Sequence, residues 1–326
     1  MSDATPGIEV LAPGLASTLQ DLGRFGRRHL GVAWSGAADP WSHTLANLLV
    51  GNPGDAASLE ITLTGPTLRF AAPTRIALCG AKIDARAGGL AIPGDRPVML
   101  PAGTVLRLGR CRGGARAYLA VAGGFRAASR LGSLATDVRG GFGGHEGRPL
   151  HKGDRLSGGH PLESATDTPV AARWWIDASP GPAPTPSDAP CRVRLLPGRD
   201  ACPDLFASAW QIDAGSNRQG LRLQGPALRI DDRRERVSEP VAPGTVQLPP
   251  DGQPIVLLAD AQTHGGYPRI GHAIRADWPL LAQAGPGDRI RFVPCSPHEA
   301  HAAGLEQRQR LYRIALAIRA RQDRHA

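Results

Sequence analysis

The sequence predicts a mostly β protein with two β-barrel domains, a few short helices and a longer helix at its C-terminal end. Turn-forming residues are abundant, since 41 Gly and 30 Pro stand among the 326 residues. Between them lie short runs of Val, Ile and Leu that alternate with polar residues, which is the pattern of strands joined by tight turns. A single hydrophobic core stops growing at roughly 250–300 residues, so the length favours two domains.

Two similar segments of the sequence, which we call the internal echo, favour a duplicated fold. The segment 63–70, LTGPTLRF, is similar to the segment 223–230, LQGPALRI, and each is expected to form an alternating strand broken by a Gly-Pro kink. Each half also ends in a turn that leads into a short strand, at 101–108 and at 286–292. The alternative is chance recurrence of a common strand start, but two matched features in the same order favour duplication.

The expected domains cover residues 1–163 and 191–326, with a linker at 164–190 between them. The linker contains a proline-rich stretch at 179–187, and proline fixes φ and lacks the N–H that a sheet ladder needs. The Trp174-Trp175 pair just before this stretch is expected to dock the linker onto a domain.

Two of the three expected helices carry recognisable start signals. Asp39-Pro40 supplies an N-cap and a proline in the first turn, and the apolar positions that follow end at Gly51. The capping box at 296–299 opens a final helix that runs to about residue 322. A shorter helix is expected at 277–284. The residues expected to pack one face of the final helix are Leu305, Leu311, Ile314, Ala315 and Ile318.

The positive charge is concentrated at the C-terminal end. The formal net charge is +9, and residues 306–326 hold six Arg against one Glu and one Asp, a net +4. The rest of the chain is only mildly basic and shows no stripe of interleaved basic and aromatic residues, so nucleic-acid binding is not expected. We interpret the basic end as the solvated face of the final helix, with a contact to nucleic acid or anionic lipid as the alternative.

Cysteine usage and hydropathy exclude several classes of protein. The five cysteines (79, 111, 191, 202 and 295) are odd in number and form no C-x-x-C pair. That argues against a zinc site or a disulfide framework and favours small buried side chains. No apolar stretch approaches the ~20 residues of a membrane span, and the N-terminus lacks the basic flank and apolar run of a secretory signal. We therefore expect a cytoplasmic protein that does not contact a membrane.

Nucleotide-binding and hydrolase motifs are also missing. The sequence contains no G-x-x-x-x-G-K-[ST], no G-x-S-x-G and no H-E-x-x-H. No lysine lies between methionines, so the chain does not look like a biotin carrier. We therefore expect neither a metal nor a cofactor to be held by this chain.

The first candidate cluster lies between residues 18 and 40 and is rich in glycine, which lets backbone amides approach a small ligand. Its polar members are Gln20, Asp21, Arg24, Ser35 and Asp39. Arg24 is suited to a carboxylate, which a guanidinium holds with two parallel hydrogen bonds. The alternatives are an ion pair of Arg24 with Asp21 and helix capping by Asp39. A glycine loop at 140–148 is a weaker second cluster.

The third cluster lies at 251–268, where an apolar strand leads into a Gly-Gly turn. Polar groups at a strand end, beside exposed backbone amides, can polarise a small amide. We assign catalytic roles to Asp260 and Tyr267. The substrate-binding candidates here are Gln262, Thr263, His264, Gly265 and Gly266, to which we add Arg218 and Gln247. A plain hairpin whose polar residues satisfy the turn is the alternative.

The clusters belong to a longer series of motifs. Those in the first half are 18–26 (TLQDLGRFG), 35–39 (SGAAD), 45–52 (LANLLVGN), 65–68 (GPTL) and 140–144 (GGFGG). Those in the second half are 246–254 (VQLPPDGQP), Ala259-Asp260, Gln262-Thr263, 265–268 (GGYP) and 286–288 (PGD). In this order they resemble the family of the C subunit of the ATP-dependent bacterial 5-oxoprolinase, also called allophanate hydrolase subunit 2, biotin-dependent carboxyltransferase or KipA-like. The resemblance spans about residues 10–293.

The resemblance implies duplicated cyclophilin-like β-barrel domains, in agreement with the internal echo. It implies one component, inactive alone, of a complex with two companions, the A subunit of 5-oxoprolinase and a KipI-like B subunit. The complex would open 5-oxo-L-proline, or a related small amide, to L-glutamate and would use ATP. One alternative is a non-catalytic regulatory partner of a KipI-like kinase inhibitor. Another is a biotin-dependent carboxyltransferase that takes carboxybiotin and acts on urea or another small amide.

The sequence departs from the family pattern at several positions. Ala38 stands where Met is usual, Asn217 where Asp is common, and His264 where Thr is usual. Leu134-Ala135 replaces Arg-Ser, and Ala261 replaces an Arg. The two missing arginines leave open which amide is the substrate and whether the chemistry is lost altogether, because neither leucine nor alanine can bind a carboxylate or carboxybiotin.

Overall fold

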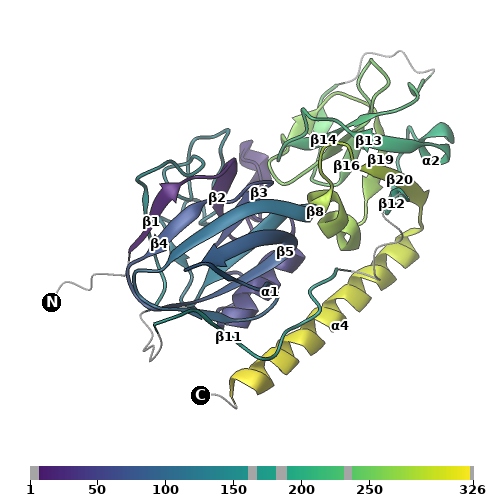
Figure 1. Ribbon diagram of the computed structural model, residues 1–326. Coiled ribbons are helices and arrows are strands. Elements are labelled where there is room, and N and C mark those ends of the chain that lie inside the picture. The colour runs from purple at the N-terminus through teal and green to yellow at the C-terminus, as the bar shows by residue number, and fades with distance from the viewer. Residues whose placement is uncertain (1–6, 161–166, 181–188, 231–236, 324–326) are drawn as a thin grey trace. The chain divides into compact units, whose positions relative to one another are not determined.

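The computed structural model describes residues 7–160, 167–180, 189–230 and 237–323. These residues form two compact units, and each unit draws on more than one stretch of the chain. The first holds the described parts of 1–24, 39–179 and 311–326, and the second holds 25–38 and the described parts of 180–310. Figure 1 shows the strands and helices of both units.

The first unit is built on an 11-stranded sheet (Figure 1). Its strands are β1 (Gly7–Ala12), β2 (Ala16–Gln20), β3 (Ser58–Thr62), β4 (Thr67–Phe70), β5 (Thr74–Ala87), β6 (Leu90–Ala91), β7 (Val98–Leu100), β8 (Val105–Val121), β9 (Phe125–Arg126), β10 (Arg155–Gly158) and β11 (Val170–Ala171). The main path runs β11-β7-β5-β8-β4-β1-β10-β9, while β2 pairs with β3, β3 with β8 and β6 with β5.

The long strands β5 and β8 form the backbone of this sheet. They pair antiparallel from Ile76 opposite Val121 to Ala87 opposite Leu106, with two irregularities in register along the way. Their buried apolar side chains join those of β1, β3 and β4 in one core. The sheet therefore gains its stability from long-range antiparallel pairing around a continuous apolar interior.

Helix α1 (Pro40–Val50) packs against β5 and β8. Asp39 accepts a hydrogen bond from the Ser42 N–H at 3.0 Å, which caps the first turn. Gly51 ends the helix at a φ of 88°, a left-handed conformation that favours glycine. The helix predicted at 39–51 is confirmed.

The second unit contains a closed barrel of seven strands. They are β12 (Cys191–Pro197), β13 (Ala209–Ile212), β14 (Gly220–Gln224), β16 (Thr245–Gln247), β17 (Ile255–Leu257), β19 (Arg269–Ala273) and β20 (Arg289–Pro294). Their order is β12-β19-β16-β17-β14-β13-β20, and the parallel pairing of β12 with β20 closes the ring. A separate two-stranded ribbon joins β15 (Glu239–Pro240) to β18 (His264–Gly265).

Short helices and one early chain segment complete the second unit. The helices are η1 (Arg28–Leu30), α2 (Asp204–Ala207), η2 (Arg275–Asp277) and α3 (Trp278–Gln283), and α3 confirms the helix predicted at 277–284. The early segment is 25–38, where the Trp34 ring meets the Trp278 ring edge-on at 5.5 Å. In the same segment the Ser35 N–H donates to the Ala259 carbonyl at 2.9 Å.

Helix α4 (Pro297–Gln322) confirms the predicted final helix and its capping box. The Glu299 N–H donates to Ser296 Oγ at 3.2 Å, and the Ser296 N–H donates to Glu299 Oε2 at 2.7 Å. Ile318 is 2% exposed, as its predicted packing requires, but Leu305 is 40% exposed. The prediction for Leu305 is wrong because the offset of 13 positions between the two residues places them about 140° apart at 3.6 residues per turn.

The fold-class prediction is confirmed: the chain is mostly β, with a closed barrel, few helices and a C-terminal helix. The echo at 63–70 and 223–230 is only partly reproduced. In the first half the Gly-Pro kink lies between β3 and β4, but in the second half β14 ends at Gln224 and no strand follows among the described residues up to 230. The second prediction is wrong beyond Gln224 because Leu228 turns into the core at 4% exposure and its N–H donates to Gly252, outside any ladder.

Residues 167–179 belong to the first unit. Strand β11 pairs with β7, the Ala172 N–H donates to Pro97 at 2.9 Å, and the Ile176 N–H donates to Asp95 at 3.0 Å. Trp175 is 65% exposed, with Arg96 Cζ at 5.1 Å from its ring centroid. Residues 181–187 of the predicted proline-rich stretch lie outside the described residues.

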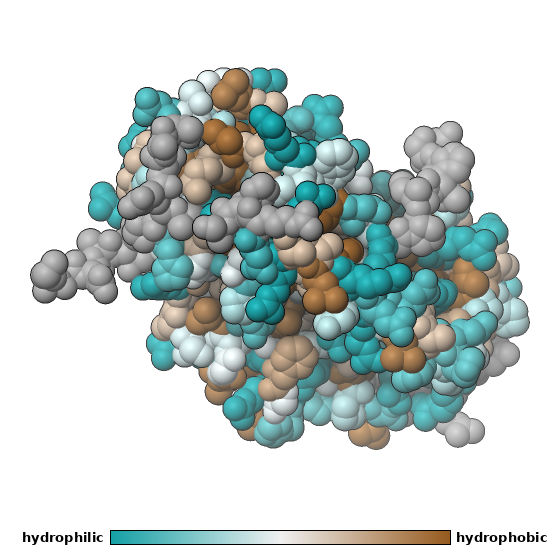
Figure 2. Space-filling view, turned by 90° about the horizontal axis from the view of Figure 1, so that it is seen from below, coloured by the Kyte–Doolittle hydropathy of each residue, from teal (hydrophilic) through white to brown (hydrophobic). Residues whose placement is uncertain are grey.

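All five cysteines are unpaired; Cys79 and Cys295 are buried, and the other three are half-buried. The face shown in Figure 2 carries hydrophobic side chains singly or in small groups among hydrophilic ones. Within the described residues, no helix combines the length and the apolar character that crossing a membrane requires.

Candidate functional site

The residues predicted to form a site lie in two groups, one in each unit. The first unit holds Gln20, Asp21, Arg24 and Asp39. The second holds Ser35, Arg218, Gln247 and Asp260, together with residues 262–267.

Gln20 and Asp21 follow one another at the end of β2 and are engaged by the protein itself. Gln20 is fully buried, and its Nε2 donates to Thr18 Oγ1 at 2.9 Å. The Asp21 carboxylate accepts from the Ser133 hydroxyl at 2.7 Å and from the Leu134 N–H at 2.6 Å. Both side chains therefore tie β2 to the loop around residue 134.

Arg24 is buried within the glycine loop instead of facing solvent. The side chain is 1% exposed, its Nη2 donates to the Ala135 carbonyl, and its Cζ lies 4.6 Å from the centroid of the Phe142 ring. A Cβ at Gly143 would overlap both Arg24 and Ala135. The close approach of a buried guanidinium therefore requires glycine at this position of the loop.

The end of the same loop is held by an ion pair. The Arg148 guanidinium donates to both carboxylate oxygens of Asp154, at 2.8 and 2.9 Å. These hydrogen bonds hold the pKa of Asp154 below its ordinary range. Asp154 therefore neutralises the positive charge at the end of the glycine loop.

Asp39 belongs to a buried polar network. Its N–H donates to the Tyr118 hydroxyl at 2.8 Å, and that hydroxyl donates to Glu60 at 2.8 Å. Arg116 lies 3.7 Å from the other carboxylate oxygen of Glu60. Burial raises the pKa of Tyr118 well above its ordinary value, so the hydroxyl remains a donor. Helix capping by Asp39, one of the alternatives from the sequence, is what the geometry shows.

His43 lies on α1 behind Asp39. Its Nδ1 lies 2.8 Å from Ser58 Oγ, and both residues are fully buried. Burial lowers the pKa of His43 to about 4. The imidazole is therefore neutral at physiological pH and acts as a hydrogen-bonding part of the core.

In the second unit, Arg218 and Asp260 form a two-fold hydrogen-bonded pair. Arg218 Nε lies 2.8 Å from Oδ2 of Asp260, and Arg218 Nη2 lies 2.9 Å from Oδ1. The same Nη2 donates to the Gly36 carbonyl at 2.6 Å. This cation therefore joins the early segment to the turn that begins at residue 259.

Ser35 stands beside this pair in a left-handed conformation, with a φ of 54°. That conformation is sterically strained in a residue other than glycine, and such positions concentrate at functional sites. Its side chain is 3% exposed, and its Oγ has no hydrogen-bond partner among the described residues. Ser35 thus carries a hydroxyl without a partner among the described residues, one position before the Gly36 carbonyl that Arg218 binds.

Gln262 links two further polar residues. Its Nε2 donates to Gln247 Oε1 at 3.1 Å, and its carbonyl accepts from Arg28 Nη2 at 2.8 Å. Arg28 Nη2 also donates to the Val241 carbonyl. Gln247 is 1% exposed, and its Nε2 would lie 2.5 Å from a Cβ at Gly265. Because Gly265 has no Cβ, the amide group of Gln247 has room at its observed position.

Of the remaining candidates, His264, Gly266 and Tyr267 lie at the surface, whereas Thr263 is buried. His264 and Gly266 are exposed, Tyr267 is 47% exposed, and Thr263 Oγ1 lies 3.0 Å from His264 Nδ1. Thr263 also accepts the Val241 N–H on its carbonyl at 2.9 Å. The turn thus offers buried donors at Gln247 and reachable side chains at His264 and Tyr267.

Arg28 was not among the candidates from the sequence. It is the second arginine of a pair between Gly26 and Gly31, and η1 carries it. Ala261, where the family pattern has Arg, is fully buried against Val241 and Leu257. The position that lacks the family arginine is therefore filled by apolar packing, while Arg28 supplies positive charge to the same turn.

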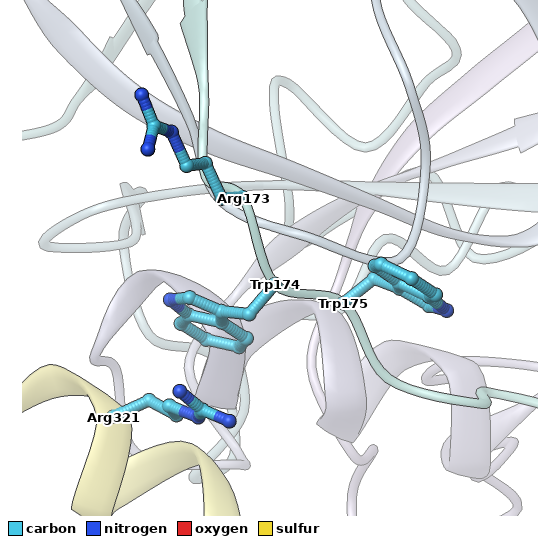
Figure 3. A pocket seen from close by; sticks show the side chains of 4 residues that line it. All are labelled: Arg173, Trp174, Trp175 and Arg321. Atoms are coloured by element: carbon cyan, nitrogen blue, oxygen red, sulfur yellow. The ribbon is translucent and has the colours of Figure 1, made fainter.

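An open hollow of about 360 Å³ lies elsewhere, in the first unit. Figure 3 shows Arg173, Trp174, Trp175 and Arg321 around it, with the Trp174 ring next to the guanidinium of Arg321. None of the predicted site residues lines it. Across the described part of the chain, no group of three or more His, Cys, Asp or Glu residues is arranged to hold a metal ion.

Comparison with known proteins gives three kinds of match. The family described as carboxyltransferase domain, subdomain A and B, matches residues 30–294. The chain is 41% identical over 316 residues to the C subunit of 5-oxoprolinase from Escherichia coli (strain K12), with 94% of this chain and 97% of that protein covered. It is 35% identical over 319 residues to the C subunit of 5-oxoprolinase from Haemophilus influenzae, with 94% and 96% covered. The crystal structure of the K. lactis urea amidolyase matches with a TM-score of 0.85 at 30% identity, over 95% of this chain and 20% of that one.

Proposed function

This chain belongs to the carboxyltransferase domain family, subdomains A and B, and from that premise we propose that it is a subunit of an ATP-dependent 5-oxoprolinase-type amidohydrolase. The complex opens 5-oxo-L-proline, or a related small amide, to L-glutamate. One water is consumed at the lactam C–N bond and one at ATP. The observation that carries the proposal is the 41% identity to the C subunit of a 5-oxoprolinase over nearly the full length of both chains.

The polar cluster of the second unit supports a role in holding a small amide. Ser35 Oγ and Gln247 Nε2 are buried without a hydrogen-bond partner among the described residues, and the exposed Tyr267 ends the turn at 259–267. A lactam carbonyl that is attacked by water gains negative charge on oxygen, which such donors stabilise. We assign Asp260 the positioning of Arg218 and of the turn, and Tyr267 the contact with substrate.

The proposal includes two companion polypeptides. The sequence has no Walker-type phosphate loop. The ATP is therefore used by the assembled complex with the A subunit of 5-oxoprolinase and a KipI-like B subunit, and this chain carries no cofactor of its own. We place the complex in the cytoplasm.

The test is glutamate release from 5-oxo-L-proline by the complex purified with both companions. We expect release that requires ATP and all three chains, and none from this chain alone. Tyr267→Phe is expected to lower the rate at least 10-fold. A complex that forms but releases no glutamate would overturn the proposal, and an unchanged rate in Tyr267→Phe would remove this residue from the site.

Carboxyl transfer is the second candidate, favoured by the family description and by the likeness to the urea amidolyase. In that case carboxybiotin, brought by another protein, would donate its carboxyl group to urea or another small amide. Biotin-dependent carboxylation of urea, without glutamate release from 5-oxo-L-proline, would favour this candidate over the first.

A further inference from the structure

Two side-chain donors in the second unit are buried without an acceptor. Among the described residues, neither Arg28 Nη1 nor Gln247 Nε2 has a hydrogen-bond partner. Buried donors are normally satisfied, because a donor removed from water without an acceptor is unfavourable. Each of these two atoms is therefore a donor that no described residue satisfies.

The two residues belong to one hydrogen-bonded arrangement. Gln262 connects them, since its carbonyl accepts from Arg28 Nη2 at 2.8 Å and its Nε2 donates to Gln247 Oε1 at 3.1 Å. Because Gln247 Oε1 is the acceptor in that bond, the other end of the amide, Nε2, points its hydrogens elsewhere. Both unused groups are thus donors, held in place by the same residue.

The Arg28 guanidinium also lacks a carboxylate partner among the described residues. Arg218 pairs with the Asp260 carboxylate, but no carboxylate of the described residues pairs with Arg28. Burial lowers the pKa of Arg28, and no acidic neighbour opposes that effect. An arginine always carries its charge in proteins, so an anion beside it would be stabilised by both charge and hydrogen bonding.

We propose that Arg28 and Gln247 bind the carboxylate of an anionic substrate. Arg28 Nη1 and Gln247 Nε2 donate to its oxygens. This rests on the proposed function and narrows it, because 5-oxo-L-proline carries a carboxylate next to its lactam and urea carries none. Arg28 also supplies positive charge to the turn in which Ala261, an apolar residue, stands.

The first experiment measures binding to the full chain, alone and in the complex, by isothermal titration calorimetry. The two probes are 5-oxo-L-proline and its neutral carboxamide, which differ only at the carboxyl group. The wild-type protein is expected to prefer the acid by about 10- to 100-fold, the range that one or two hydrogen bonds to a charged group provide. Arg28→Met is expected to remove this preference.

Two variants serve as controls for folding and for location. Arg27→Met removes the neighbouring arginine, which is exposed, and is expected to keep the preference. Gln247→Glu keeps the oxygen that accepts from Gln262 but replaces the donor with an anion. It is expected to weaken binding of the acid at least 10-fold while affinity for the carboxamide stays the same.

The outcomes separate this inference from the proposed function. Equal affinity of the wild-type protein for the two probes, or a preference that survives in Arg28→Met, would overturn the carboxylate site even if glutamate is released. A preference that depends on Arg28, in a complex that releases no glutamate, would support the carboxylate site while the proposed function fails. A wild-type protein that binds neither probe would also overturn the site.

Discussion

Arg218 holds both carboxylate oxygens of Asp260, with Nε 2.8 Å from Oδ2 and Nη2 2.9 Å from Oδ1. The side chains are 13% and 6% exposed, so the pair is largely shielded from water. Because Arg218 Nη2 also donates to the Gly36 carbonyl, the pair fixes two distant parts of the sequence to one another. This arrangement gives Asp260 a structural role in addition to any part in the chemistry.

Removing the carboxylate alone is therefore expected to destabilise the second unit. In Asp260→Ala the largely buried Arg218 guanidinium loses its two hydrogen bonds to the carboxylate, and breaking comparable pairs costs about 3–5 kcal/mol. The measurement is urea-induced unfolding followed by the fluorescence of the buried Trp210. The double variant Arg218→Met/Asp260→Ala should recover part of the loss, and Asp251→Ala, on the surface, should change little. Unfolding of Asp260→Ala at the wild-type urea concentration would contradict this account.

Gly265→Ala is expected to impair substrate binding by displacing Gln247. The added Cβ would lie 2.5 Å from Gln247 Nε2, closer than side-chain atoms approach one another. We expect KM for 5-oxo-L-proline to rise about 10-fold, as for loss of one hydrogen bond to a charged group. The double variant with Gln247→Ala should be no worse than Gln247→Ala alone. Additive effects of the two substitutions would show that Gly265 acts independently of Gln247.

The glycine loop at 140–148 offers a matched pair of substitutions. Gly141 and Gly143 both have a positive φ, 68° and 74°, but only at Gly143 would a Cβ overlap Arg24 and Ala135. Gly141→Ala is expected to cost about 1 kcal/mol from backbone strain alone. Gly143→Ala is expected to cost about 3 kcal/mol or more, because overpacking is added to that strain. Thermal unfolding of the two variants provides the comparison, and equal losses would mean that Arg24 does not constrain the loop.

Asp95→Asn is expected to stabilise the first unit at alkaline pH. Burial raises the pKa of Asp95 from 3.8 to about 6, against the opposing hydrogen bond from Cys79. The folded state therefore binds a proton more tightly than the unfolded state, and the stability from this group is lost as pH rises from about 4 through 6. Asparagine tolerates the φ of 58° at this position and carries no charge.

For Asp95→Asn we expect the free energy of unfolding to rise by about 1–2 kcal/mol at pH 8 and not at all at pH 4. This gain is smaller than the full pKa shift of Asp95 implies because the carboxylate is partly solvated. The measurement is urea-induced unfolding at both pH values. Asp84→Asn, on the surface, is the control and should show no such pH dependence. A gain that is the same at pH 4 and pH 8 would assign the effect to something other than titration.

Local sequence signals predicted the elements that local chemistry determines. The N-cap at Asp39, the glycine at 51 and the capping box at 296–299 each place a helix end, because a few neighbouring atoms decide them. The strand after Gly225-Pro226 was wrongly expected because its conformation depends on Gly252, a partner that lies far along the chain. Periodicity cannot reveal such a partner.

The candidate site shows the same contrast between features that local sequence determines and features that depend on distant residues. The sequence marked the polar turn at 259–267, but it gave Arg24 and Arg28 similar surroundings of glycine and positive charge. Only tertiary contacts separate them, since Arg24 is enclosed by Phe142 and Gly143 while Arg28 reaches the carbonyl of Gln262. No signal in the sequence marks residues 25–38 as part of the second unit.

The membership of residues 25–38 in the second unit limits how this protein can be divided or recombined. A polypeptide expressed from residue 191 onward would contain all seven barrel strands but would lack the carbonyl that Arg218 binds and the cation that reaches Gln262. Gene shuffling at the proline-rich stretch would therefore transfer the barrel without the early residues that make polar contacts with it. A transplantable version would have to carry the early segment with it, for example as a circular permutant in which that peptide is joined ahead of β12.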